Sequence, residues 1–373
     1  MMVLIGPVLP VPAPQPVTDA LTSAQVTTTA GQADGFQLTF ALSDKSMLNR
    51  VLLPVGYFDP GIRVILLVVL GGLPTVLIDG IITRQDVAPS NTPGASTLTI
   101  TGEDLSVLMG MDVKYVCYPG LPAEGVVAAI CAQYALYGIV PAPVPPALLD
   151  VPDPIEQIPV QSGTDLDHLR ILAQKAGYVF FIQPGPLPGA SIAYWGPEVR
   201  VGVPQPPLNV NMDAETNVES ISFSYDGLAR RQFTITIQEP ITGLSIPIPV
   251  PDISILRPPL AARPAISLRH APLPDTANLN PVQAALMGLG QEISDSDAVT
   301  GQGTLDVLRY GNILKARQLV SVRGAGLTYD GFYYVTSVTH SIKRGEYKQN
   351  FQLARDGVVS LTPLVPTLPA VPT

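Results

Sequence analysis

Positive charge is scarce in the first half of this chain. Residues 1–160 contain only a handful of cations, namely Lys45, Arg50, Arg63, Arg84 and Lys114, and the 373-residue chain has a formal net charge of −9. Proteins that bind a nucleic-acid backbone do so through many lysine and arginine contacts to phosphates. We therefore expect no specific nucleic-acid binding.

Long apolar runs are also missing. The strongest run, VILLVVL at residues 64–70, ends at Gly71 and Gly72 and is far shorter than the roughly 20 residues that a membrane-spanning helix needs. It predicts a buried strand and no membrane span. The N-terminal sequence MMVLIGPVLPVPAPQPV has no basic segment and is interrupted by prolines, so it does not predict a secretion signal. We expect folding and assembly in the cytoplasm.

Cysteines are few and are not spaced for metal binding. Cys117 and Cys131 do not form a CxxC pattern, and Cys131 falls on the apolar side of a predicted helix. Without a secretion signal, buried free thiols are favoured over a disulfide.

Residues suited to catalysis are dispersed. No GxSxG, HExxH, Walker or GxGxxG pattern occurs, and these are the common signatures of hydrolase, metal and nucleotide sites. His168, His270 and His340 lie in different parts of the chain, whereas a metal or general-base site needs convergent donors. His340 continues a mostly apolar row on a predicted strand, so we interpret it as structural. We expect no catalytic, cofactor-binding or metal-binding residues, no cofactor and no enzymatic activity.

Carboxylates offer another catalytic hypothesis. Asp165 and Asp167, or Glu103 and Asp104, could supply the acid pair of a glycoside hydrolase. Asp165 and Asp167 fall in the first turn of a predicted helix, where the helix dipole accounts for them. Nothing in the sequence selects an acid with a raised pKa.

A basic cluster flanks the predicted turn KRGE near the end of the chain. Lys343, Arg344 and Lys348 are interpreted as solvated charges, with a contact to an acidic partner as the alternative.

Apolar residues are abundant. Hydrophobic residues make up 46% of the chain, charged residues only 14%, and the mean hydropathy is +0.31. A chain of this size has difficulty hiding so much apolar surface within itself, so we expect extensive subunit contacts. The length predicts two to three domains.

Strand patterns dominate both ends of the chain. Alternating and β-branched residues predict strands in AQVTTTA, FQLTFAL, RVILLVVL, TVLIDGIITRQDV and STLTITG. We assign these strands to a first tube-like β-barrel domain, residues 21–112. The β pattern returns in ESISFSYDG, RRQFTITIQE, ARQLVSVRG, FYYVTSVTHSI and YKQNFQLAR, which we assign to a second such domain, residues 211–360.

Two helices separate these domains. One begins at Pro122 and ends at Gly138; the other, TDLDHLRILAQKAG, begins with a capping-box pair, Thr164 and Asp167, and ends at Gly177. With the strands YVFFIQP and SIAYWG they predict a small α/β middle domain, residues 113–210. The fold class is therefore mainly β, with two antiparallel β-barrels and an α/β middle domain.

Proline marks three further segments. Residues 1–20 are predicted to be an N-terminal arm. Residues 240–274 contain nine prolines and are predicted to be an ordered, non-sheet insertion, followed by a short helix capped by Asn280. Residues 361–373 form a tail with proline at every third position, the period of a polyproline helix. We expect this tail to contact a neighbouring protein, with a disordered terminus as the alternative.

A pattern of about forty residues occurs twice. The order strand, paired glycines, Asp-Gly, strand, turn, strand and acidic residue is found in VILLVVL-GG-LPTVLIDG-IITRQDV-APSNTPGA-STLTITGED and again in VSVRGAGLTYDG-FYYVTSVTHSI-KRGEY-KQNFQLARD. Asp79 and Gly80 correspond to Asp330 and Gly331. The shared order predicts an internal duplication.

The segment GTLDVLRYGNILKARQLVSVRGAGLTYDGFYYVTSVTHSIKRGEYKQNFQLARDG resembles the C-terminal signature of central baseplate hub proteins of contractile tails. These include the late control protein D family of phages, the hub of the T-even phage baseplate and the hub part of VgrG-type proteins. The phrase QSGTDLDHLRILAQKAGYVFFIQPG is similar to the middle-domain helix and strand of that family. VgrG-type proteins continue into a spike, whereas this sequence stops at Thr373, so a separate spike protein is expected.

The resemblance implies a structural symmetry adaptor. Its expected partners are two further copies in a homotrimer, a hexameric tail tube protein, a trimeric spike protein, baseplate wedge proteins and LysM-type baseplate proteins. The chain would be part of a phage tail or of a contractile injection particle. Two other functions stay open, a tail-associated hydrolase of cell-wall glycan and a β-rich carbohydrate-binding protein.

Overall fold

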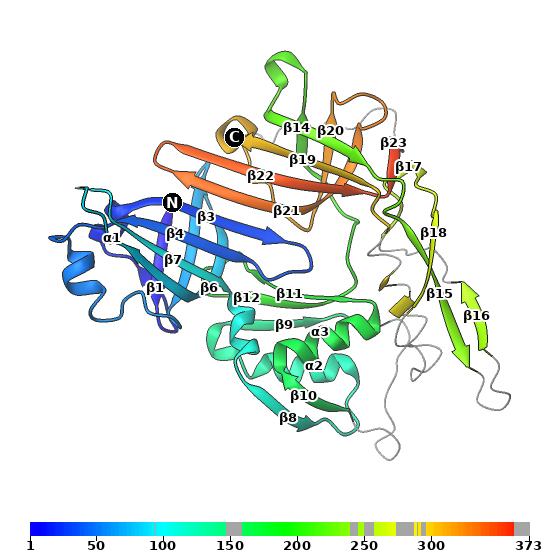
Figure 1. Ribbon diagram of the computed structural model, residues 1–373, viewed down its shortest axis with the longest axis horizontal. Coiled ribbons are helices and arrows are strands. Elements are labelled where there is room, and N and C mark those ends of the chain that lie inside the picture. The colour runs from blue at the N-terminus through cyan, green and yellow to red at the C-terminus, as the bar shows by residue number, and fades with distance from the viewer. Residues whose placement is uncertain are drawn as a thin grey trace. The chain divides into compact units, whose positions relative to one another are not determined.

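The chain, seen in a computed structural model, is mainly β (Figure 1), as the sequence predicts. The structure describes residues 1–92, 94–146, 159–238, 245–249, 257–273, 287–288, 290–291 and 296–361. Two compact units are present. Unit 1 comprises Met1–Arg170, Phe180–Gly196 and Thr339–Lys348, and unit 2 comprises Ile171–Val179, Pro197–Val338 and Gln349–Thr373. No helix of the described residues is long and apolar enough to cross a membrane.

Unit 1 contains one large antiparallel sheet with the order β3-β4-β7-β6-β5-β1-β2. Its strands are β1 (Met2–Gly6), β2 (Val11–Pro12), β3 (Leu21–Thr29), β4 (Gly35–Ala41), β5 (Arg63–Leu70), β6 (Leu73–Ala88) and β7 (Thr97–Asp104). The five strands predicted from alternation are confirmed as β3 to β7. The apolar run is buried from Val64 to Val68, and β5 has a paired strand on each side.

The N-terminal segment is part of this sheet and not the separate arm that its prolines indicate. Strand β1 pairs antiparallel with β5, and the alternate residues Val3 and Ile5 are buried. Prolines 7, 10, 12, 14 and 16 all lie after β1, so they do not interrupt its pairing with β5. A short helix, α1 (Gln15–Ala20), leads into β3.

The α/β elements predicted for the middle of the chain are present. Helix α2 (Ala123–Ala132) begins after Pro122 and buries Val126, Val127, Ile130 and Cys131. A 3-10 turn, η3 (Ala135–Tyr137), ends at Gly138, which has a left-handed conformation. Strands β9 (Ile139–Pro143), β11 (Val179–Pro184) and β12 (Ser191–Gly196) form a sheet of order β11-β12-β9, and β8 (Val113–Cys117) pairs with β10 (Val160–Thr164).

Helix α3 (Asp165–Ala176) has the predicted cap. The Thr164 hydroxyl accepts a hydrogen bond from the Asp167 backbone N–H (3.1 Å) and donates one to the Asp167 carboxylate (2.7 Å). Aspartate is too short to reach back to the cap N–H as glutamate does in a capping box, so it binds the hydroxyl instead.

The second set of strands lies mostly in unit 2 and has the order β14-β19-β22-β21-β20-β13. Because β21 also neighbours β3, the two sets belong to one 13-stranded sheet, and its two parts are called the first and the second sheet below. Its strands are β13 (Gln205–Asn209), β14 (Val218–Tyr225), β19 (Val299–Asp306), β20 (Leu319–Arg323), β21 (Gly331–Lys343) and β22 (Glu346–Arg355). The tip of the β21–β22 hairpin, Thr339–Lys348, belongs to unit 1, where the hydroxyls of Thr27 and Thr339 lie 3.1 Å apart.

The two sheets share one strand plan, and the repeat is longer than its sequence signature. In chain order, β1, β3, β4, β5, β6 and β7 correspond to β13, β14, β19, β20, β21 and β22, and the lateral order is then the same in both sheets. A short helix precedes the fourth strand of each set, η1 (Leu48–Leu52) in one and α5 (Val307–Tyr310) in the other. One pairing differs, because β1 runs antiparallel to β5 whereas β13 runs parallel to β20.

The second copy carries a long insertion between β14 and β19. Its described strands are β15 (Arg231–Gln238), β16 (Ser245–Pro249), β17 (Ala261–Pro264) and β18 (Arg269–Pro272), and β17 pairs with β23 (Gly357–Ser360). The prediction of non-sheet structure for residues 240–274 is wrong for these parts. In the order β16-β15-β18, the prolines of β16 and β18 lie on edge strands, where a missing N–H is tolerated. The helix predicted after Asn280 falls largely, and the tail 362–373 entirely, outside the described residues.

Candidate functional site

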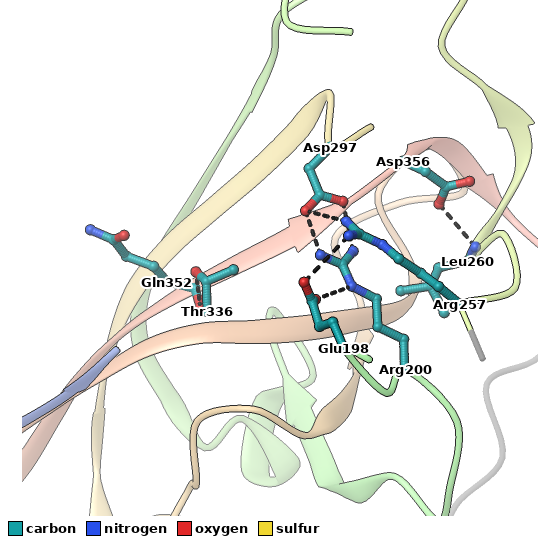
Figure 2. Close-up of polar contacts among 8 residues, drawn as sticks. All are labelled: Glu198, Arg200, Arg257, Leu260, Asp297, Thr336, Gln352 and Asp356. Atoms are coloured by element: carbon teal, nitrogen blue, oxygen red, sulfur yellow. Dashed lines mark hydrogen bonds and ion pairs between the residues drawn. The ribbon is translucent and has the colours of Figure 1, made fainter. Parts of the chain in front are cut away.

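Four charged side chains of unit 2 meet in one buried cluster (Figure 2). Arg200 forms a two-pronged ion pair with Asp297, with both N–O distances 2.6 Å, and its Nε donates to Glu198 at 2.7 Å. Arg257 donates to Glu198 at 3.3 Å and to Asp297 at 3.1 Å. The Arg200 guanidinium also lies 4.5 Å from the centre of the Tyr334 ring. Two positive and two negative groups therefore neutralise one another.

Asp297 and Arg200 keep their charges at neutral pH. Burial by itself would raise the pKa of Asp297, but the facing guanidinium groups of Arg200 and Arg257 lower it on balance. Burial would likewise lower the pKa of Arg200, and Asp297 and Glu198 raise it on balance. A general acid or base needs a pKa near the working pH. The pKa of Asp297 is lowered, and so lies further from neutral pH than that of an ordinary carboxyl group. The cluster acts as an anchor: Arg257 of the insertion is held to Glu198 and to Asp297, which lies two residues before β19.

A second anchor holds the same insertion (Figure 2). The Asp356 carboxylate, at the end of β22, accepts hydrogen bonds from the backbone N–H groups of Leu260 (2.9 Å) and Ala261 (3.1 Å). Burial raises the pKa of Asp356, and these N–H groups oppose the rise. Arg230 adds a bond to the Ala265 carbonyl at 2.7 Å.

Unit 1 has its own buried ion pair. Arg63 and Asp79 are each about 1% exposed and are joined by two hydrogen bonds of 2.7 and 2.6 Å. Arg63 also donates to the Val8 carbonyl, and Ser191 donates to Asp79. In the sequence, Asp79 stands out only as part of the Asp-Gly pair that recurs at Asp330 and Gly331. The pair could have been found by folding β5 and β6 about Gly71 and Gly72, which brings residues 63 and 79 close together across the hairpin.

Asp165, one of the candidate catalytic acids, is the centre of a polar network. It accepts hydrogen bonds from Gln161 (2.6 Å), Lys114 (2.5 Å) and Tyr134 (2.7 Å). Burial would raise the pKa of Asp165, but these donors lower it on balance. Asp165 is therefore an anion at neutral pH and is poorly suited to donate a proton.

The other candidate carboxylates have local roles. Asp104 accepts hydrogen bonds from the backbone N–H groups of Asp34 (2.6 Å) and Ser106 (2.8 Å), whereas Glu103 is exposed. Asp167 is occupied by the cap of α3. The structure does not bring a glycosidase-type pair together from these residues.

The three histidines do not converge. His340 is buried with Nδ1 2.8 Å from the Tyr347 hydroxyl, and burial lowers the pKa of His340 to about 4, so the ring is neutral at pH 7. His168 stacks on Tyr118, and His270 lies exposed on β18. In the part of the chain that the structure describes, no three His, Cys, Asp or Glu side chains gather as a metal site would require.

The three cations that flank the basic turn, Lys343, Arg344 and Lys348, have different surroundings. Arg344 donates to the Asp19 carbonyl, Lys348 lies 3.5 Å from Glu346, and Lys343 is exposed.

Both cysteines are free thiols. Cys131 is buried as expected, but Cys117 is exposed, which corrects that expectation. It lies on β8, whose sheet has only two strands and covers little of its own surface.

Comparisons with known proteins give no match to a family model and none to a curated protein. Solved structures do match. A tail protein from Neisseria meningitidis has a TM-score of 0.63 and 15% identity, with 96% of each chain covered. A 43 kDa tail protein of prophage MuSo2 from Shewanella oneidensis has a TM-score of 0.63 and 14% identity, with 96% of this chain and 99% of that chain covered.

A third match is a component of a secretion system. An Escherichia coli component of the type VI secretion system, described as structurally similar to the T4 bacteriophage tail proteins gp27 and gp5, has a TM-score of 0.53 and 11% identity, with 92% of this chain and 74% of that chain covered. At such identities the likeness concerns the fold. The chain has the fold of these phage tail and secretion-system proteins, which confirms the resemblance to hub-type tail proteins at that level.

Proposed function

We propose that this chain is a non-enzymatic structural hub of a contractile phage tail or injection particle. Three copies form a ring whose six β domains, residues 21–112 and 211–360 of each chain, are arranged with pseudo-sixfold symmetry around the middle domains. The ring joins a hexameric tail tube on one side to a trimeric spike on the other, with wedge and LysM-type proteins around it. It assembles in the cytoplasm and becomes part of the particle.

The observation that carries this proposal is the six-strand duplication. Two copies of one strand plan in each chain give three chains six similar elements, so one ring can present equivalent contacts to a sixfold partner and true threefold contacts to another. The apolar composition, with a mean hydropathy of +0.31, supports burial of further surface between subunits.

The hairpins centred on β5–β6 and on β20–β22, residues 64–86 and 319–353, are proposed to line the central channel. Arg84 is the sole cation within residues 64–86. The part of the wall that the first β domain supplies therefore has few positive charges and would let nucleic acid or protein pass without strong attraction.

A non-enzymatic role is favoured by the state of the charged groups. The buried carboxylates Asp79, Asp165 and Asp297 each have a cationic partner at 2.5–2.6 Å, and these contacts serve stability. A zymogram on cell-wall glycan tests the rival hydrolase function, and clearing by the purified chain would overturn the proposal.

Native mass spectrometry of the purified chain tests the ring. We expect a trimer of the 39.4 kDa chain, and rotational averaging of particles should show six similar β domains in one layer. A closed hexamer, or a trimer whose two β domains lie in different layers, would contradict the proposal.

A further inference from the structure

The insertion of unit 2 has an exposed apolar tip. The tip is the four-residue connection between β17 and β18, residues 265–268 (Figure 1). The side chains of Ile266 and Leu268 are 77% and 64% exposed, whereas Ala265 is buried. The first sheet has no counterpart to this connection, because β3 and β4 are joined by residues 30–34 alone. The tip is therefore an addition to the repeated strand plan.

The backbone fastens the tip at its base. The Ala265 N–H donates to the Asp356 carbonyl (2.9 Å), and the Ala265 carbonyl accepts a hydrogen bond from Arg230 (2.7 Å). Strand β17 pairs with β23 before the tip, and β18 pairs with β15 after it. Ile266 and Leu268 therefore extend from an ordered backbone, and side chains that are ordered beforehand lose less entropy when they bind.

Arginines flank the tip. Residues 257–273 contain three arginines and no aspartate or glutamate, although the whole chain has 30 acidic residues. Arg263 lies two residues before the tip and Arg269 follows it directly, and both are exposed. The third arginine, Arg257, is held in the buried cluster of Figure 2. The nearby Asp356 carboxylate is bound to N–H groups at the start of β17. The exposed charges of this segment are therefore positive.

The size and composition of the tip favour a lipid surface over a protein partner. A protein interface of standard size buries about 800 Å² on each partner, and the tip presents only two large exposed side chains. A lipid bilayer accepts single apolar side chains at its interface, while arginines bind the phosphates of its headgroups. Since the chain has a net charge of −9, an anionic surface would be approached with the tip foremost.

We propose that the insertion carries a membrane-contact tip, which binds the surface of an anionic phospholipid bilayer through Arg263, Ile266, Leu268 and Arg269. The two apolar side chains enter the headgroup region, and the two guanidinium groups bind lipid phosphates. Contact is peripheral and reversible, because two side chains cover far less apolar area than a spanning helix. This inference goes beyond the proposed function and does not depend on it, since one chain carries the whole tip.

The first test is cosedimentation of the full-length chain with vesicles of equal parts phosphatidylcholine and phosphatidylglycerol, and with vesicles of phosphatidylcholine alone. We expect binding to the anionic vesicles that weakens as the salt concentration rises, and little binding to the neutral ones. Ile266→Ser combined with Leu268→Ser should weaken binding about tenfold. Arg263→Gln combined with Arg269→Gln should weaken it about twentyfold.

Helix α5 supplies a matched control. Leu308 is 68% exposed and its neighbour Arg309 is also exposed, but Asp306 lies in the same turn. Leu308→Ser combined with Arg309→Gln should bind the anionic vesicles as the wild type does. Circular dichroism and the midpoint of urea unfolding should be unchanged in every variant, since the altered side chains are in solvent.

A second test locates the tip in the bilayer. The sequence has one tryptophan, Trp195, which is fully buried. In Ile266→Trp, the added indole should be quenched by brominated phosphatidylcholine in the anionic vesicles. In Leu308→Trp, the added indole should not be quenched. Quenching that is equal in the two variants would overturn the proposal.

Other outcomes would also overturn the membrane-contact tip. These are a wild type that does not bind the anionic vesicles, equal binding to neutral vesicles, unchanged binding by the tip variants, and an equal loss in the α5 control. If the tip variants instead lose capture of another tail protein while the wild type binds no vesicles, the tip is a protein contact and the proposal is wrong. The trimeric ring is tested separately by native mass spectrometry, so its failure is distinguishable from failure of the tip.

Discussion

The two sheets each bury an arginine, but they neutralise it in different ways. In unit 1, Arg63 is paired with the carboxylate of Asp79 at 2.6 Å. In unit 2, Arg355 is fully buried and donates to the carbonyls of Gly357, Asp330 and Thr328 at 2.8–2.9 Å, and it lies 4.4 Å from the centre of the Tyr333 ring. Burial lowers the pKa of Arg355, and the nearby Tyr333, Asp356 and Asp330 oppose this without a hydrogen-bonded carboxylate.

The same contrast appears in the repeated Asp-Gly pairs. The Asp79 carboxylate neutralises Arg63. The Asp330 carboxylate instead accepts a hydrogen bond from the Ala325 N–H, and Arg355 donates to the backbone carbonyl of Asp330. Equivalent positions in a repeat thus keep the strand plan while their side chains take different partners. The repeat specifies where strands begin and end, and local packing decides the chemistry.

The largest expected effect comes from breaking the carboxylate-paired site. Asp79→Ala leaves Arg63 buried without its counter-charge, and we expect a loss of about 3–5 kcal/mol in the free energy of unfolding. Urea denaturation monitored by circular dichroism measures it. The matched control is Asp86→Ala, which breaks the exposed Arg84–Asp86 pair and should change stability by about 0.5 kcal/mol or less. Similar losses in the two variants would contradict the account.

Arg355→Met tests the buried arginine of the second sheet, whose hydrogen bonds go to backbone carbonyls and not to a carboxylate. The variant keeps an apolar contact to Tyr333 but removes the Arg355 donor from three carbonyls, of which Thr328 keeps the Val359 N–H, so we expect a loss of about 2–4 kcal/mol. This is smaller than the Asp79→Ala effect because no carboxylate is hydrogen-bonded to Arg355, so the substitution does not break a direct ion pair. A loss larger than that of Asp79→Ala in the same denaturation experiment would reverse the comparison.

The anchor of the insertion should give a smaller and more local effect. Arg257→Gln leaves Glu198 and Asp297 with one guanidinium, and we expect about 1–3 kcal/mol of destabilisation. Hydrogen exchange should accelerate at the Leu260 and Ala261 amides and stay unchanged in β4 and β7. Arg263→Gln, at an exposed position of β17, is the control. Uniform acceleration across both sheets would show that Arg257 is not a local anchor.

His340 gives the smallest effect at neutral pH and a defined pH dependence. His340→Gln keeps a partner for the Tyr347 hydroxyl and should cost no more than about 1–2 kcal/mol at pH 7. In the wild type, the pKa of His340 falls from about 6.5 when unfolded to about 4 when folded, so between these values the unfolded chain binds the extra proton. This contribution to stability is full above about pH 6.5 and declines as the pH falls toward 4.

The measurement is urea denaturation at pH 7 and pH 5. The wild type should lose more stability on acidification than His340→Gln, because the variant has no proton to bind at this position. Equal losses in the two proteins would mean that the His340 ring is protonated in the folded state.

Much of the fold could be predicted because its signals are local. Alternation and β-branched residues identify β3 to β7 and β20 to β22, and Pro122 and Gly177 mark helix ends. Each of these signals lies within one helix or strand or at its ends. There the backbone conformation and the direction of the side chains depend on residues that are close along the chain. The resemblance in the last segment added the architecture that local signals do not carry.

Other features could not be predicted because they depend on pairing between distant segments. The strands of the proline-rich insertion exist because β15 and β23 supply partners, and the burial of β1 depends on β5. The cluster around Arg200 joins residues 97 positions apart. Periodicity in the sequence does not reveal such a contact, because two ion-pair partners need a favourable geometry in space and not a fixed spacing along the chain.

The sequence by itself determined the forty-residue part of the repeat, with its strands and its glycine turns, because turn and alternation rules act over a few residues. The tertiary structure alone decided that Ile266 and Leu268 are exposed while Arg63 and Arg355 are buried. Exposure depends on which segments cover a residue, and those segments come from other parts of the chain.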